Sequence, residues 1–133
     1  EPIMVYLSTV KKQVNQIQLI QFQSIFFDFD KSDILLKYKG KLDKVVEFLN
    51  SNPQLSLELS SYTDCRGPDS YNLELSNRRN KSVVNYIKNR IKNPERVSGK
   101  GYGEKSSLGK NSCFKTSETE HQKNRRTDFK LKF

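Results

Sequence analysis

The chain is predicted to fold as an α/β (α+β) two-layer sandwich, in which two main helices cover one face of a mixed β-sheet. Two observations predict this class. Segments with helical spacing of apolar residues alternate with segments of strand-like alternation, and the order is strand–helix–strand–helix–strand–turn–strand. At 133 residues, the chain is long enough to form one domain with a real core. It has no run of 18 apolar residues, so we expect no membrane-spanning segment.

Residues 1–22 are the least informative part of the chain. Val10, Val14 and Ile17 have helical spacing, but the apolar residues near them fit a strand equally well. We interpret residues 1–22 as a linker or the tail of a preceding domain, and residues 23–133 as the folded domain. The chain does not begin with Met, and we expect it to be a piece of a longer protein.

The first strand and helix are predicted by their apolar residues. Residues 25–27 form an apolar run that we expect to be a core strand, and residues 28–32 form a charged turn after it. A helix should follow, because apolar residues recur at spacings of three and four. These residues are Leu35, Tyr38, Leu42, Val45 and Leu49. The Pro-containing segment 50–53 is expected to end this helix.

The centre of the chain is predicted to be a strand, a turn and a second helix. Leucines at alternate positions of residues 55–59 indicate a half-buried strand, and residues 65–69 have turn composition. The helix after the turn has an apolar stripe that includes Val83. At about 100° per residue, Arg79 lies about 40° from that stripe and Arg78 about 140° from it. The two arginines should therefore differ in role.

A guanidinium at the margin of a buried face needs an anionic partner. Asp64 follows the central strand and is the nearest candidate, at a strand end of the kind where ligands bind in open α/β sheets. Two interpretations of Asp64 and Arg79 remain open. They form either a purely structural ion pair, or a two-signed site for a ligand that carries both a cationic amine and a carboxylate.

The last third of the chain is predicted to add two strands. Residues 96–103 form a short glycine-rich strand that does not match a phosphate-binding loop, so its glycines should permit close backbone packing. Ser117 and Glu120 have the spacing of a capping box for a short helical turn. Residues 127–133 alternate as a half-buried strand. Arg126, just before it, is expected to brace Asp64, to hold a carboxylate, or to be solvated.

Cys65 and Cys113 are the only cysteines, and both lie in predicted loops. We predict a disulfide between them, which implies an oxidising compartment such as the periplasm. His121 is the only histidine, and no Cys/His/acid cluster has the spacing of metal ligands in the sequence. No nucleophile–histidine set can be assembled either. We therefore expect no catalysis, no cofactor and no metal.

The chain is basic, with 24 Lys and Arg against 15 Asp and Glu, a formal net charge of +9. Such a balance admits nucleic acid, anionic lipid or an acidic polymer as partner. Nucleic-acid binding is the weaker alternative, because the cations are distributed along the whole chain and no strand carries the aromatic and basic pattern of an RNA-binding motif. We expect no nucleic-acid partner.

Several sequence blocks, taken in order over residues 22–133, closely resemble the C-terminal domain of the OmpA family. The family includes the peptidoglycan-associated lipoproteins and the flagellar-motor stator anchors. The blocks are Ser61-Tyr62-Thr63-Asp64, Gly67, Tyr71-Asn72, Leu75-Ser76-x-Arg78-Arg79, Gly101-Tyr102-Gly103-Glu104 and Asn124-Arg125-Arg126. The Cys-Arg-Gly loop and the basic ending are similar to Bacteroidetes-type members, often carried on multidomain outer-membrane lipoproteins.

The resemblance implies non-catalytic binding of peptidoglycan through the diaminopimelate of its stem peptide. It implies that the parent protein lies at the periplasmic face of the outer membrane and anchors an outer-membrane protein or envelope complex to the cell wall. In the family pattern, the positions of Asp64 and Arg79 clasp the diaminopimelate. The ligand site that spacing and resemblance together predict comprises Phe29, Asp30, Thr63, Asp64, Asn72, Leu75, Arg79 and Arg126.

One departure from the family pattern lies next to the predicted site. The usual Gly-His before Thr-Asp is Ser61-Tyr62 in this chain, so the family histidine is absent. An interaction module whose pocket has lapsed, and which binds a protein partner instead, therefore stays an alternative.

Overall fold

The computed structural model describes residues 23–105, 113 and 117–132. The predicted linker at residues 1–22 and the last residue of the predicted final strand lie outside the described residues. The elements, in chain order, are β1 (Ile25–Phe26), α2 (Leu36–Ser51), β2 (Ser56–Ser61), α3 (Asp69–Lys88), the 3-10 turn η1 (Pro94–Arg96), β3 (Val97–Gly101), α4 (Glu118–Asn124) and β4 (Arg126–Lys132).

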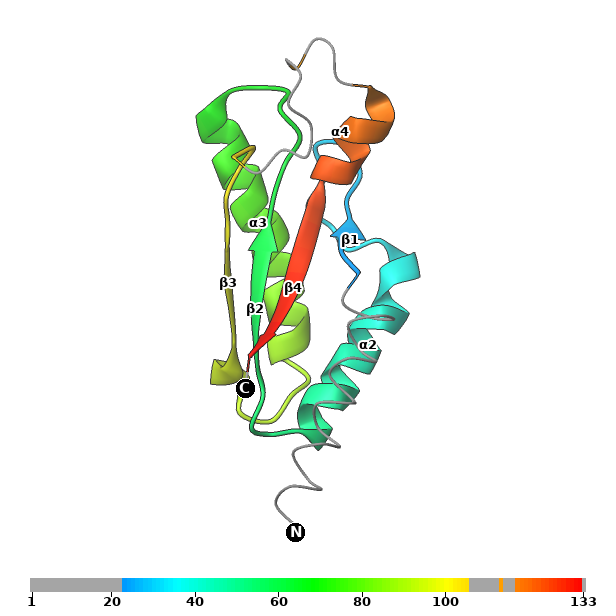
Figure 1. The fold of residues 1–133 in the computed structure, drawn as a ribbon, viewed down its shortest axis with the longest axis vertical. Helices are drawn as coiled ribbons and strands as arrows, with labels where there is room; N and C mark the ends of the chain where they lie inside the picture. The colour runs from blue at the N-terminus through cyan, green and yellow to red at the C-terminus, as the bar shows by residue number, and fades with distance from the viewer. Residues whose placement is uncertain (1–22, 106–112, 114–116, 133) are drawn as a thin grey trace.

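The sheet has four strands in the order β1-β4-β2-β3. Strand β2 pairs in parallel with β3, and it pairs antiparallel with β4, which also pairs antiparallel with β1. The parallel pair requires a crossover, and α3 provides it. In Figure 1, α3 lies behind the strands and α2 lies beside it. The predicted α/β sandwich with a mixed sheet is therefore confirmed.

The core lies between the sheet and the two long helices. Helix α2 buries Tyr38, Leu42, Val45 and Leu49, which are the residues of its predicted stripe, apart from the first. Helix α3 contributes Val83 and Ile87 to the same cluster. On β2, buried residues alternate with half-buried ones, so that Leu57, Leu59 and Ser61 share the covered face. Both periodicities in the sequence thus point to one core.

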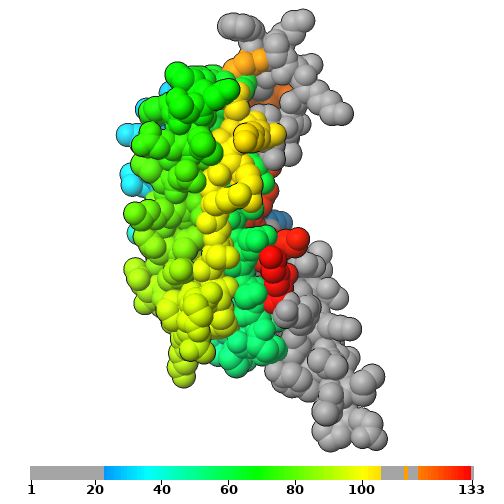
Figure 2. Space-filling view, turned by 90° about the vertical axis from the view of Figure 1, so that its left-hand side faces the viewer, coloured from blue at the N-terminus to red at the C-terminus, as the bar shows by residue number. Residues whose placement is uncertain are grey.

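Close backbone contact fixes α3 against the edge strand β3. A Cβ atom at Gly101 would lie 2.3 Å from the Ser76 hydroxyl oxygen and 2.4 Å from the backbone nitrogen of Asn77, both on α3. One at Gly99 would lie 2.2 Å from the carbonyl oxygen of Leu59 on the neighbouring strand β2. Only glycine allows this approach, as the sequence predicts. Figure 2 shows β3, in yellow, lying against α3 along the edge of the molecule.

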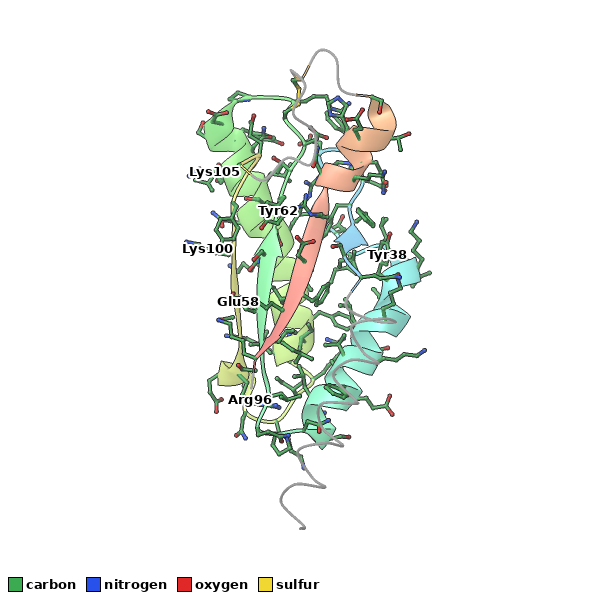
Figure 3. All side chains as sticks on the ribbon, in the orientation of Figure 1. Tyr38, Glu58, Tyr62, Arg96, Lys100 and Lys105 are labelled. Atoms are coloured by element: carbon green, nitrogen blue, oxygen red, sulfur yellow. A yellow bond between two sulfur atoms is a disulfide. The ribbon has the colours of Figure 1, made fainter. Side chains whose placement is uncertain are left out.

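Different segments of the chain lie at the two ends of the sheet. The carboxyl end of β2 lies at the same end of the molecule as the start of α3 and the short helix α4 (Figure 1). Arg96 lies at the opposite end, where Figure 3 labels it. No helix in the part of the chain that the structure describes is long and apolar enough to cross a membrane.

Candidate functional site

A cavity of about 340 Å³ opens at the carboxyl end of β2. Its walls come from the loop after β1, the loop between β2 and α3, and the first half of α3. The lining residues are Phe29, Asp30, Thr63, Asp64, Arg66, Gly67, Pro68, Tyr71, Asn72, Leu75 and Arg79. The fold thus brings seven of the eight residues predicted for the ligand site to one cavity, and Arg126 is the exception.

Arg79 is the most deeply buried charged group at the cavity, with none of its surface exposed. The sequence predicts the margin of the buried face, and the structure places Arg79 deeper than that. Its Nε donates to the carbonyl oxygen of Lys31 at 2.7 Å, and Nη1 and Nη2 donate to those of Tyr62 and Asp28, both at 3.1 Å. The guanidinium therefore ties the loop after β1 to the end of β2.

The guanidinium of Arg79 is buried without a direct ion pair in the part of the chain described. Its hydrogen-bond partners there are three carbonyl oxygens, and it lies 5.2 Å from the ring centre of Phe27. Burial lowers the pKa of Arg79 to about 10, although the negative charge of Asp64 acts in the opposite direction. Arg79 therefore stays charged at neutral pH. A structural Asp64–Arg79 ion pair, one of the two interpretations left open by the sequence, is not what the structure contains.

Asp64 is also buried, with 3% of its surface exposed, but it is surrounded by donors. Its Oδ1 accepts from the backbone N–H of Arg66 at 3.0 Å and from Arg66 Nε at 3.3 Å. Its Oδ2 accepts from Arg66 Nη2 at 2.8 Å and from Arg125 Nη1 at 3.3 Å. Burial alone raises the pKa of Asp64, but the bonds to Arg66 and Arg125 outweigh it and hold that pKa below its usual value.

The sequence reasoning missed the two arginines that hold Asp64, Arg66 and Arg125. Arg125 Nε also donates to the carbonyl oxygen of Phe27 at 2.9 Å. Arg66 lies over the exposed ring of Phe29, 4.3 Å from its centre. Glu118 on α4 accepts from both arginines at 3.3 Å. The Asn-Arg-Arg block could have indicated Arg125, but the sequence analysis assigned the contact with Asp64 to Arg126, the second arginine of the block.

Arg126 does not brace Asp64, and the structure corrects that expectation. Its Nε donates to Asp128 Oδ1 at 3.1 Å, and its guanidinium lies 4.2 Å from the ring centre of Tyr62. Tyr62 also stacks on Tyr102, with ring centres 5.6 Å apart. Figure 3 labels Tyr62 beside the carboxyl end of β2. Neither Ser61 nor Tyr62, the pair at the family departure, lines the cavity. The departure therefore lies outside the cavity lining of this chain.

Polar and apolar side chains complete the cavity. The Tyr71 hydroxyl donates to the Asp30 carboxylate, and Asn72 Nδ2 donates to Glu104 Oε1 at 2.9 Å. Leu75 is buried beneath them. The Thr63 hydroxyl oxygen is buried and has no hydrogen-bond partner among residues 23–105, 113 and 117–132. A buried hydroxyl at a cavity wall is a position where a ligand group can supply the missing bond.

The predicted disulfide between Cys65 and Cys113 is confirmed, with the two Cα atoms 5.8 Å apart. Cys65 lies between Asp64 and Arg66 in the chain. The bridge therefore anchors the loop that carries both members of the shortest ion pair at the cavity, whose nitrogen and oxygen are 2.8 Å apart.

Comparisons with known proteins give a family match and several relatives. The OmpA family model matches residues 26–125. The peptidoglycan-associated lipoprotein of Pasteurella multocida is 32% identical over 106 residues, which are 80% of this chain and 68% of that protein. The photosystem I P700 chlorophyll a apoprotein A2 of Gloeobacter violaceus is 33% identical over 121 residues, which are 87% of this chain but 14% of that protein. The chain therefore spans only a small part of some relatives.

The fold has a close counterpart among solved structures. The peptidoglycan-associated lipoprotein of Burkholderia pseudomallei superposes with a TM-score of 0.74 at 24% sequence identity. The match covers 82% of this chain and 89% of that protein chain. At this level of identity, the likeness shows a shared fold.

Proposed function

Because this chain belongs to the OmpA family, we propose that it is a non-catalytic module that binds peptidoglycan and so anchors an outer-membrane protein or envelope complex to the cell wall. The related lipoproteins are named for their association with peptidoglycan, and this chain would act on the same periplasmic side of the envelope. One observation carries the proposal: the buried guanidinium of Arg79 faces a cavity without a direct ion-pair partner among the described residues.

The ligand group we propose is the diaminopimelate of the stem peptide, because its side-chain end carries an ammonium and a carboxylate together. A guanidinium has five N–H groups, and three of those on Arg79 donate to carbonyl oxygens. One N–H on each terminal nitrogen then remains for a ligand carboxylate. Hydrogen bonds between ionised groups are the strong ones, and a carboxylate that accepts from both remaining N–H groups would be fixed in orientation.

The ammonium of the ligand would bind Asp64, but that carboxylate is already occupied. Two carboxylate oxygens offer about four lone-pair sites, and the structure places four donors on Asp64. Arg66 is the exchangeable partner, because a third of its side chain is exposed and it already contacts Glu118. Binding therefore includes release of the Arg66 side chain from Asp64, with Glu118 as its remaining partner.

The remaining lining groups give the cavity its shape. The Thr63 hydroxyl would donate to or accept from the ligand backbone, and Asn72 and Asp30 line the cavity beside it. Phe29 and Leu75 supply apolar contacts to the methylene groups between the charged ends. A ligand with only one of the two charges would leave the opposite group of the cavity unpaired, which disfavours its binding.

Co-sedimentation with purified peptidoglycan sacculi tests this function. We expect the chain to pellet with sacculi that contain diaminopimelate, and an excess of a diaminopimelate-containing tripeptide to release it. Moderate salt should leave much of the binding intact, since a buried contact is screened less than an exposed one. Binding that salt abolishes and the tripeptide does not compete would instead come from the net charge of +9, and would contradict the proposal.

A further inference from the structure

A second cluster of reactive side chains lies behind the cavity wall. The sulfur atoms of Cys65 and Cys113 and a ring nitrogen of His121 all lie within 4.8 Å of one another. Cys65 belongs to the loop between β2 and α3, and His121 belongs to α4. Cys65 lies 48 residues before Cys113 in the chain, so the sequence spacing of the three residues does not indicate a metal site. The fold nevertheless brings their side chains together.

His121 is buried, with 6% of its surface exposed. Its Nδ1 atom has no hydrogen-bond partner among the described residues. A buried ring nitrogen without a partner is uncommon in native structures and calls for an explanation. In a neutral imidazole, one ring nitrogen offers a lone pair, which is the form in which histidine binds a metal ion.

The two cysteines are joined by a disulfide, and a thiolate is the form of cysteine that binds metal. Reduction supplies it. A dithiol reductant transfers two electrons and two protons to the Cys65–Cys113 bond, which breaks to give two thiols, while the reductant closes its own disulfide. A divalent cation then replaces the two thiol protons, which pass to solvent, and accepts the imidazole lone pair.

We propose that Cys65, Cys113 and His121 form a binding site for a zinc-type divalent cation when the disulfide is reduced. Two thiolates and one imidazole are a ligand set that suits zinc, with water in the fourth position. Zinc–sulfur and zinc–nitrogen bonds of about 2.3 and 2.0 Å would place the ligand atoms about 3.4–3.8 Å apart in tetrahedral geometry. After reduction the two sulfur atoms would move apart from bonding distance. The ring nitrogen lies within 4.8 Å of both, so it would need to approach them by no more than about 1.3 Å.

The bound cation would connect Cys65 to Cys113, as the disulfide does in the oxidised chain. It would join Cys65, which lies between Asp64 and Arg66, to Cys113 and α4. The loop that carries Asp64 would thus be anchored in the oxidised chain by a covalent bond and in the reduced chain by a metal ion. This inference does not depend on the proposed ligand of the cavity.

The test uses the whole chain in two redox states. The chain is reduced with a phosphine, freed of it without oxygen, loaded with zinc and desalted, and the zinc is measured by mass spectrometry. We expect one zinc per reduced chain and none per oxidised chain. Cobalt(II), added in place of zinc, should give the thiolate-to-metal absorption and the tetrahedral visible bands that a mixed sulfur and nitrogen site produces.

Variants separate the site from general thiol binding. His121→Gln should weaken zinc binding at least about tenfold, since even the loss of an outer-shell partner costs that much. Lys123→Gln, an exposed change on the same helix, should have no effect. Circular dichroism of the oxidised variants checks that they fold. A reduced wild-type chain that retains no zinc after desalting, or equal affinity in wild type and His121→Gln, would overturn the proposal.

Discussion

The two charged ends of the cavity are built differently. The guanidinium of Arg79 is completely buried and is held by carbonyl oxygens, whereas the carboxylate of Asp64 is held by two arginines. For the proposed ligand the difference has a physical consequence: its carboxylate would meet a charge that is already oriented, but its ammonium would first have to displace Arg66. We therefore expect the anionic half of the ligand to contribute most of the affinity and the cationic half to contribute selectivity.

Arg96 provides a second comparison at the other end of the sheet. It also donates to main-chain carbonyl oxygens, those of Leu49 and Leu55 at 3.0 Å and that of Lys92 at 2.7 Å. Arg96 does not line the cavity described above. Carbonyl-bound arginines can therefore be purely structural in this fold. Arg79 differs from Arg96 in two respects: it is completely buried, whereas Arg96 is half-buried, and it lines the cavity.

The largest expected effect is that of Arg79→Lys. Lysine keeps the positive charge but has a single charged nitrogen in place of the fork, so the carboxylate of the ligand loses its paired donors. Truncating one partner of a buried charge pair costs about 2–5 kcal/mol of binding. Equilibrium binding of a diaminopimelate tripeptide measures the loss.

Arg96→Lys is the matched control for Arg79→Lys. Both changes remove bonds to carbonyl oxygens, so both should lower the free energy of unfolding, by about 1.5–3 kcal/mol for each bond from a charged donor that is lost. When affinity is calculated for the folded molecules alone, only Arg79→Lys should weaken binding of the tripeptide. Equal binding losses in the two variants would show that Arg79 is also purely structural.

Asp64→Asn should have the next largest effect, and it should act on selectivity. The wild-type chain should bind a tripeptide with a free side-chain amine more tightly than the acetylated tripeptide, by about 1.5–3 kcal/mol, the range for a hydrogen bond to a charged group. Asp64→Asn should bind both alike. Asp128→Asn, which changes the partner of Arg126 outside the cavity, should keep the wild-type preference. Preserved discrimination in Asp64→Asn would remove the ammonium contact from the account.

The pH dependence of ligand binding should report the charge of the Arg79 guanidinium. Its pKa in the folded chain is lowered by burial to about 10 from a usual value of 12.5, so Arg79 loses its charge at a lower pH than an exposed arginine does. The affinity ratio between tripeptides with diaminopimelate and with lysine isolates the carboxylate contact, because both ligands carry the ammonium. The ratio should be constant between about pH 6 and 9 and fall toward one above about pH 10. A ratio that falls already near pH 7 would contradict this assignment.

The smallest expected effect is that of Arg66→Met, and its sign is informative. Removing the guanidinium that competes with the ligand ammonium should tighten binding, by no more than about 1 kcal/mol because the ion pair is partly exposed. Lys81→Met removes one positive charge from the exposed face of α3, away from the residues that line the cavity, and should leave affinity unchanged. If Arg66→Met weakens binding, Arg66 contacts the ligand rather than competing with it.

Much of the fold was predictable because its signals are local. The apolar stripe of α2 and the alternation of β2 repeat within a few residues, and each states directly which face is buried. The burial of Arg79 was partly predictable for the same reason, because its angular position on the helix can be calculated from that of the buried Val83. The closeness of Gly101 to Ser76 was predictable only as a tendency of glycine-rich strands.

The partners of Asp64 were not predictable in this way. Arg125 and Arg126 are adjacent, and a shift of one residue at the start of β4 exchanges the faces they point to. The strand begins at Arg126, which leaves Arg125 at the end of α4 and beside Asp64. The meeting of His121 with Cys65 and Cys113 depends on how α4 packs against the loop, and nothing local in the sequence encodes it.

Isothermal titration of the wild-type chain with two tripeptides tests the central claim most directly. The tripeptides differ only in their third residue, which is diaminopimelate in one and lysine in the other, so they differ by one carboxylate. We predict that the diaminopimelate tripeptide binds more tightly by about 2–5 kcal/mol, the contribution of a buried charge pair. Equal affinities, or no binding of either tripeptide, would contradict the account, because Arg79 would then have no ligand carboxylate to bind.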